Sequence, residues 1–169
     1  MSEAPSDKIA RFDGRMVMVG FGSIGQGVLP LLLRHIDIEP GRITIVTAEE
    51  RGRAGAEELG VKFMVSPRRQ GNYLSILEPL LSSGDFLVNL SVDVSSLALV
   101  EFCRSKGALY LDTCIEPWSG QYTDAKRSPS QRSNYALREN ALALRDKYEG
   151  GPTAILTHGA NPGLVSHFV

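Results

Sequence analysis

Short apolar runs alternate with helix-forming stretches along most of the chain. The apolar runs predict six buried strands, over residues 16–19, 42–46, 62–65, 86–90, 109–111 and 154–157. The stretches between them predict helices over residues 24–34, 49–59, 73–81, 95–106 and 134–148. Because strands alternate with helices throughout, the pattern predicts an α/β protein with a Rossmann-type, doubly wound parallel sheet.

Three regions depart from this alternation. Residues 1–14 are polar and predict a loose N-terminal tail, which places the ordered domain over residues 15–158. Residues 113–130 form a long loop, and loops of this length are usually functional or mobile. Residues 159–169 open a further helix behind a Pro-Gly turn. We interpret this end as the start of the connection to a second α+β domain, cut off at the C-terminus.

A glycine-rich loop follows the first predicted strand. Residues 20–25 read Gly-Phe-Gly-Ser-Ile-Gly and fit the dinucleotide fingerprint G-x-G-x-x-G. In that fingerprint Gly20 permits the tight turn, Gly22 lets the backbone approach a pyrophosphate, and Gly25 lets the helix pack closely. The alternative is a plain glycine turn between two core elements. The strand before it and the helix after it favour pyrophosphate binding between Gly20 and Gly27.

The second strand bears on the choice between NAD and NADP. An acidic residue about 20 positions after the glycines normally binds the adenosine ribose, and Thr47 stands where that residue would fall. Glu49 or Glu50 could reach the ribose from the next turn, which favours NAD. Arg51 and Arg53 could instead suit a 2′-phosphate, and all four could be ordinary surface charges.

Polar side chains gather where the later strands end. Because ligands bind at the carboxyl ends of parallel strands, these residues are expected to share one crevice: Asn89, Ser91, Asp93, Asp112, Thr113, Cys114, Glu116, His158 and Asn161. Three carboxylates converging there suit a cationic substrate better than an anionic one. Any of them could instead cap a helix, Asp112 in particular.

Composition excludes several classes of protein. A formal net charge of -1 provides no field that would attract nucleic acid or an anionic membrane. The apolar runs are far shorter than the roughly 20 residues that span a bilayer, and the N-terminus does not look like a secretory signal, so we expect a cytoplasmic protein. Cys103 and Cys114 lack metal-ligand spacing and are expected to be reduced thiols, with no metal site.

Three segments together resemble the bacterial homospermidine synthases. They are the glycine loop at residues 20–27, the run Asp-Thr-Cys-Ile-Glu-Pro-Trp at residues 112–118, and Gly-Ala-Asn-Pro-Gly at residues 159–163. The family is related to saccharopine dehydrogenase and carboxynorspermidine synthase, and the middle run is the more specific part. The resemblance extends over the chain from Arg15, and the family's proteins are much longer than this sequence.

The resemblance implies an NAD-dependent enzyme of polyamine biosynthesis. The implied reaction transfers an aminobutyl group between two putrescine molecules through imines, releases ammonia and recycles NAD. Asp93, Glu116 and Asn161 match family positions that face the nicotinamide and substrate. The residues expected to contact the cofactor are Gly20, Gly22, Ser23, Ile24, Gly25, Thr47, Asn89, Thr113 and Asn161. A homodimer of the full-length protein is expected, with much of the substrate pocket in the second domain.

Other interpretations of these residues remain open. Trp118 could cover a diamine by cation–π contact, but packing is the more common role of a lone tryptophan. His35 is expected to be structural, His158 lies nearer the crevice, and Cys114 has no evident base to activate it. A saccharopine dehydrogenase-like or carboxynorspermidine synthase-like oxidoreductase and a non-catalytic NAD-binding domain are the alternative functions.

Overall fold

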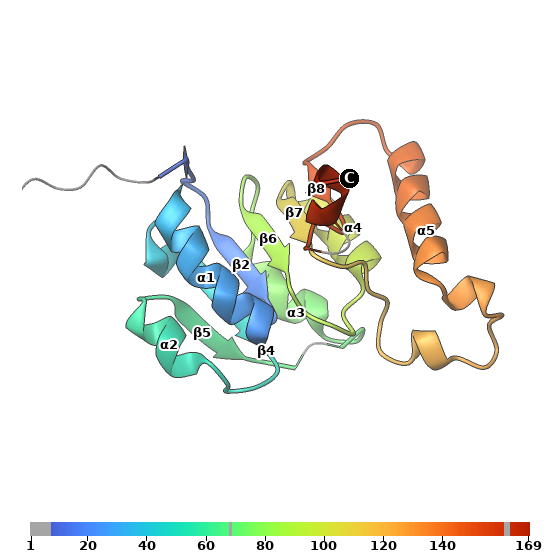
Figure 1. Cartoon of the computed structure of the whole chain (residues 1–169), viewed down its shortest axis with the longest axis horizontal. Helices are drawn as coiled ribbons and strands as arrows, with labels where there is room; N and C mark the ends of the chain where they lie inside the picture. The colour runs from blue at the N-terminus through green and yellow to red at the C-terminus, as the bar shows by residue number, and fades with distance from the viewer. Residues whose placement is uncertain (1–7, 68, 161–162) are drawn as a thin grey trace, which may run out of the picture.

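The chain is built around a six-stranded parallel sheet (Figure 1). A computed structural model describes residues 8–67, 69–160 and 163–169. The strands are β2 (Met16–Val19), β4 (Ile43–Thr47), β5 (Lys62–Val65), β6 (Phe86–Asn89), β7 (Leu109–Asp112) and β8 (Ala154–Ile155). Their spatial order is β5-β4-β2-β6-β7-β8, the arrangement of doubly wound dinucleotide-binding sheets. The predicted α/β class is confirmed.

Strand register brings the loops of the site together. Val19 pairs with Val46 on one side and with Asn89 on the other, and Asn89 in turn pairs with Asp112. Four neighbouring strands therefore end at nearly the same level. The chain order reverses between β2 and β6, and in such sheets the ligand crevice lies at this reversal.

Helices cover both faces of the sheet. They are α1 (Ser23–His35), α2 (Arg53–Glu58), α3 (Tyr73–Leu77), α4 (Ser96–Lys106) and α5 (Asn134–Lys147). Alternate β2 residues point to opposite faces. Met16 and Met18 pack in one hydrophobic cluster with Leu29 of α1, and Val17 and Val19 pack in another with residues of α3 and α4. Both faces are thus buried, which explains why the central strands are almost wholly apolar.

Local signals account for the helix boundaries. The Ser95 hydroxyl accepts a hydrogen bond from the Ala98 N–H (3.3 Å) and caps α4, which ends at Gly107 in the left-handed conformation (φ 73°). Ser133 caps α5 in the same way through the Ala136 N–H (3.2 Å). α1 runs through Pro30 to His35. Short 3-10 turns lie at Pro40–Arg42, Glu78–Leu80, Gln121–Thr123, Ser130–Arg132 and Leu164–His167.

Three regions differ from the sequence predictions. Within the predicted loose tail, β1 (Ala10–Arg11) pairs with β3 (Ile36–Asp37) in a small parallel sheet. The helix predicted over residues 49–59 begins only at Arg53. Gly52 has a φ of 86°, a conformation that breaks the helix before that point. The helix expected in the final stretch is only the 3-10 turn Leu164–His167.

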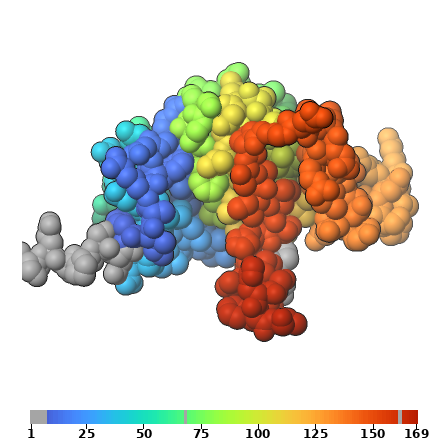
Figure 2. All heavy atoms as spheres, turned by 90° about the horizontal axis from the view of Figure 1, so that it is seen from above, coloured from blue at the N-terminus to red at the C-terminus, as the bar shows by residue number. Residues whose placement is uncertain are grey.

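The C-terminal residues project from the body of the domain (Figure 2). Phe168 is 80% exposed and Leu164 is 47% exposed, so this segment packs little of its apolar surface on the domain. Among the described residues, no helix is both long and apolar enough to cross a membrane.

Candidate functional site

The glycine loop packs directly against the segment that follows β6. Gly20 has a φ of 91°, and its N–H donates to the Val46 carbonyl at 2.9 Å. A Cβ added at Gly20 would lie 2.8 Å from the backbone N and Cα of Ser91, too close for any side chain. Only glycine fits here, and the two loops meet where the strand order reverses.

The start of α1 is open to an anion. Gly22 is the N-cap residue; no side chain caps this helix end and no acidic residue lies in its first turn. A Cβ added at Gly22 or Gly27 would meet nothing within 4 Å, whereas one at Gly25 would lie 3.0 Å from the Gly20 carbonyl oxygen. Ser23 and Ile24 are exposed. The first backbone N–H groups of a helix lack intrahelical acceptors, so this geometry fits a pyrophosphate.

The charged loop after β4 is partly occupied by its own ion pairs. Thr47 is buried at the end of the strand, and its carbonyl accepts from the Ser66 N–H at 2.7 Å. Glu50 pairs with Arg53, which holds the pKa of the Glu50 carboxyl below its ordinary value. Arg53 also bonds Glu57 at 3.1 Å. Glu49 is exposed in this loop. It is therefore the more available of the two glutamates proposed for the ribose.

Asp93 and Glu116 come together on the other side of the reversal. Asp93 adopts a left-handed conformation with a φ of 61°, which is uncommon outside glycine and occurs often at functional sites. Its backbone N–H lies close enough to the Glu116 carboxyl to lower the pKa of that group. Burial raises the pKa of Glu116, and the negative charges of Asp93 and Asp112 raise it further. The three carboxyls of Asp93, Asp112 and Glu116 therefore lie close enough to influence one another.

Two further groups surround this pair. The Cys114 thiol lies 3.8 Å from the Ile115 carbonyl oxygen, and burial followed by the nearby Glu116 charge raises the thiol pKa. Cys114 is therefore protonated at neutral pH, which agrees with the interpretation that it is not a nucleophile. Burial, with a smaller effect of Glu116, raises the pKa of Tyr122 to about 12. Its hydroxyl lies 2.8 Å from Asn134 Oδ1, and nothing in the sequence had singled it out.

A buried polar network lies beneath the crevice. Asn89 Oδ1 accepts from the Ser91 hydroxyl at 2.6 Å, and its amide nitrogen lies 3.4 Å from the Tyr110 hydroxyl. The Tyr110 hydroxyl donates to Asp112 Oδ2 at 2.9 Å, while the Thr157 N–H donates to Asp112 Oδ1 at 2.6 Å. Asp112 is fully buried, and burial raises its pKa. It joins the ends of β7 and β8 rather than capping a helix.

The remaining predicted residues have different settings. Thr113 is half-buried directly after β7. The His158 N–H donates to the Asp112 carbonyl at 2.9 Å, and the His158 ring lies 5.9 Å from that of His167. Asn161 lies outside the described residues. Trp118 is 8% exposed and packs 5.1 Å from the Tyr73 ring, which makes it a packing residue.

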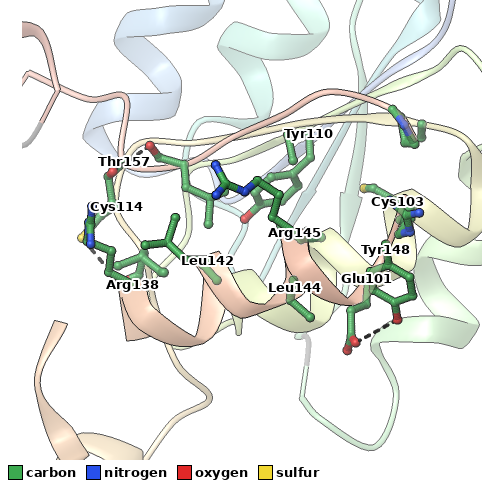
Figure 3. Close-up of a pocket in the computed structure, with 18 of the residues that line it drawn as sticks. Glu101, Cys103, Tyr110, Cys114, Arg138, Leu142, Leu144, Arg145, Tyr148 and Thr157 are labelled. Atoms are coloured by element: carbon green, nitrogen blue, oxygen red, sulfur yellow. Dashed lines mark hydrogen bonds between the residues drawn. The ribbon is translucent and has the colours of Figure 1, made fainter. Parts of the chain in front are cut away.

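A separate cavity of about 900 Å³ lies between α5 and the layer formed by α4, β7 and β8. Cys114 and Thr157 line its end nearest the crevice, and Glu101 and Tyr148 line the opposite end, where their side chains lie 3.4 Å apart (Figure 3). No residue of the glycine loop borders it. Leu137 is the residue of α5 that is buried. This helix therefore stands off the sheet along most of its length.

The glycine loop and the sheet order correspond to a known family. A family model of the saccharopine dehydrogenase NADP binding domain matches residues 16–155. The chain belongs to this family. The match begins at β2 and ends in β8, and so includes every strand of the six-stranded sheet.

This chain is similar to part of several longer proteins that are homospermidine synthases. The homospermidine synthase of Blastochloris viridis is 49% identical over 162 residues, which are 94% of this chain and 34% of that protein. The Mesorhizobium japonicum homospermidine synthase is 45% identical over 92% of this chain. A crystal structure of the Legionella pneumophila homospermidine synthase in complex with NAD is 42% identical, with a TM-score of 0.81 over 96% of this chain and 32% of that one. The chain spans about a third of the length of these relatives.

Proposed function

We propose that this chain is the NAD-binding domain of a homospermidine synthase. The observation that carries the proposal is that the glycine loop and the segment carrying Asp93 lie side by side where the strand order reverses. Gly20 lies against Ser91, so backbone donors that suit a pyrophosphate stand beside the segment that carries Asp93. The similarity to homospermidine synthases over more than nine-tenths of this chain supports the same function.

Under this proposal the cofactor residues border one bound dinucleotide. The N–H groups at Gly22, Ser23 and Ile24 bind the pyrophosphate, and Gly25 keeps the helix close enough to present them. Thr47, Asn89, Thr113 and Asn161 are proposed to border the rest of the dinucleotide. Bound NAD supplies a hydride acceptor that later returns the hydride, so no net NADH is formed.

The carboxylates are proposed to act on the amine substrate. Putrescine is a dication at neutral pH, and charge-assisted hydrogen bonds to Asp93 and Glu116 hold one of its ammonium groups beside the nicotinamide. Burial raises the pKa of Glu116 above its ordinary value, which is the direction that favours a role in proton transfer. The overall reaction joins two putrescine molecules, releasing ammonia from the nitrogen that is replaced. Asn161 is proposed to complete this side of the pocket.

The proposal extends to the whole protein. We propose that a second α+β domain supplies the rest of the substrate pocket, since the relatives are about three times as long as this chain. Residues 15–158 are then the NAD-binding domain, and residues 159–169 begin the connection. A homodimeric assembly and a cytoplasmic location belong to the same proposal.

Incubating the full-length protein with putrescine and NAD tests the reaction. We expect homospermidine and ammonia in equal amounts, without accumulation of NADH. Net NADH formation would instead favour an ordinary dehydrogenase of the saccharopine type. NAD binding without any product would favour a non-catalytic domain.

A further inference from the structure

Two hydrogen bonds clamp the backbone of Glu116 to the first turn of α4. The Glu116 N–H donates to the Ser96 hydroxyl at 2.9 Å, and the Ser96 N–H donates to the Glu116 carbonyl at 2.8 Å. The backbone N–H and the backbone carbonyl of Glu116 are thus both hydrogen-bonded to Ser96. Glu116 lies in a long loop, where no ladder of a helix or strand could fix it otherwise.

Ser96 is itself held from below. Its side chain has no exposed surface and lies close enough to the Asp112 carboxyl to lower the pKa of that group. The same carboxyl accepts from the Thr157 N–H at 2.6 Å. The Ser96 hydroxyl therefore lies between the buried carboxylate at the end of β7 and the main chain of Glu116, from whose N–H it accepts a hydrogen bond.

We infer that Ser96 is a positioning residue that holds the Glu116 carboxylate in place for the diamine substrate. The inference rests on the proposed function. The Asp93 N–H and the Cys114 thiol influence the carboxyl from nearby, and the two hydrogen bonds from Ser96 fix the backbone that carries it. A displacement of about 1 Å at a reacting group can lower a rate roughly 100-fold.

Ser95 offers a matched control at the neighbouring position. It is buried on the same helix end, but its hydroxyl caps α4 through the Ala98 N–H and is not hydrogen-bonded to Glu116. Removing the Ser95 hydroxyl therefore weakens the helix without releasing Glu116. Comparing alanine variants of the two serines therefore separates a loss of stability from a loss of the position of Glu116.

The test compares Ser96→Ala, Ser96→Thr and Ser95→Ala in the full-length protein, with putrescine and NAD. We expect Ser96→Ala to lower kcat by about 10- to 100-fold and to change the pH profile of kcat/KM, with an unchanged Kd for NAD. Ser95→Ala should lower the melting temperature by about 2–6 °C and leave kcat within about twofold. Ser96→Thr keeps the hydroxyl, so it should recover most of the rate even if its added methyl group lowers the melting temperature.

Each contrary outcome has a definite meaning. Equal kcat values for the two alanine variants, or loss of NAD binding in Ser96→Ala, would overturn the positioning role. So would failure of Ser96→Ala to show a cooperative thermal transition, because the hydroxyl would then be a requirement of the fold. If the unaltered protein forms no homospermidine from putrescine, the proposed function fails instead, and that result is visible before any variant is compared.

Discussion

A single methyl group at Gly20 should destabilise the domain, while the same group at Gly22 should not. At Gly20 the φ of 91° costs an alanine roughly 1–2 kcal/mol. The new Cβ would also lie 2.8 Å from the Ser91 backbone, and forcing such an overlap costs roughly 1–3 kcal/mol. The free energy of unfolding should therefore fall by about 2–5 kcal/mol, which corresponds to a melting temperature lower by about 4–20 °C.

Gly22 provides the contrast. Its φ of -74° and ψ of -157° suit any residue, and a Cβ there meets nothing within 4 Å. Gly22→Ala should therefore melt within about 2 °C of the unaltered chain. Because the methyl group projects toward the proposed pyrophosphate, NAD affinity should fall by about 10- to 150-fold, the equivalent of one charge-assisted hydrogen bond. Gly22→Val should abolish NAD binding and still fold.

Differential scanning calorimetry and titration calorimetry of the two variants give the needed quantities. A Gly20→Ala protein as stable as the parent would refute the strain and overlap argument at the loop. Unchanged NAD affinity in a folded Gly22→Val protein would remove the pyrophosphate from this loop altogether.

Three further predictions concern charge. Glu116→Gln in the full-length protein should lower the rate with putrescine by about 10- to 150-fold at constant NAD affinity, and parental turnover or lost NAD binding would contradict the substrate role. NAD should bind more tightly than NADP, and Glu49→Gln should narrow that difference more than Glu50→Gln, because Glu50 already pairs with Arg53; titration calorimetry with both nucleotides checks this. Burial raises the Asp112 pKa above 3.8, so this carboxyl contributes its stability at low pH and loses it as pH rises through the raised value. The free energy of unfolding, measured in urea between pH 3 and 8, should show this loss of stability with rising pH in the parent, and the Asp112→Asn variant should lack the contribution.

The parts of this structure that could be predicted are those that a short, continuous stretch of sequence determines. Each buried strand is a run of apolar residues, and the fingerprint glycines follow one of them directly, so the sheet and the proposed cofactor loop could be located before any coordinates. The cap serine Ser95 and the terminating Gly107 likewise mark α4 by local chemistry.

The parts that could not be predicted depend on contacts between distant segments. Gly52 breaks the expected helix, and a side chain there would collide with the ring of Phe21, 31 positions earlier, at 2.8 Å. The two-residue strands β1 and β3 are too short to carry a pattern and exist through their pairing. Ser95 and Ser96 look equivalent in sequence, and only the fold shows that one caps the helix while the other holds Glu116.

In the proposed reaction, the positive charge of the substrate and the pKa of Glu116 should influence each other. Burial, and then the negative charges of Asp93 and Asp112, disfavour ionisation of Glu116. A bound diammonium ion would reverse that effect, because a positive charge beside the carboxyl lowers its pKa. Substrate binding should therefore favour the ionised form of Glu116, and departure of the nitrogen as ammonia should remove that effect. The size of this coupling depends on the distance between the carboxyl and the ammonium group, so it requires a fixed position of Glu116, which the hydrogen bonds from Ser96 would supply.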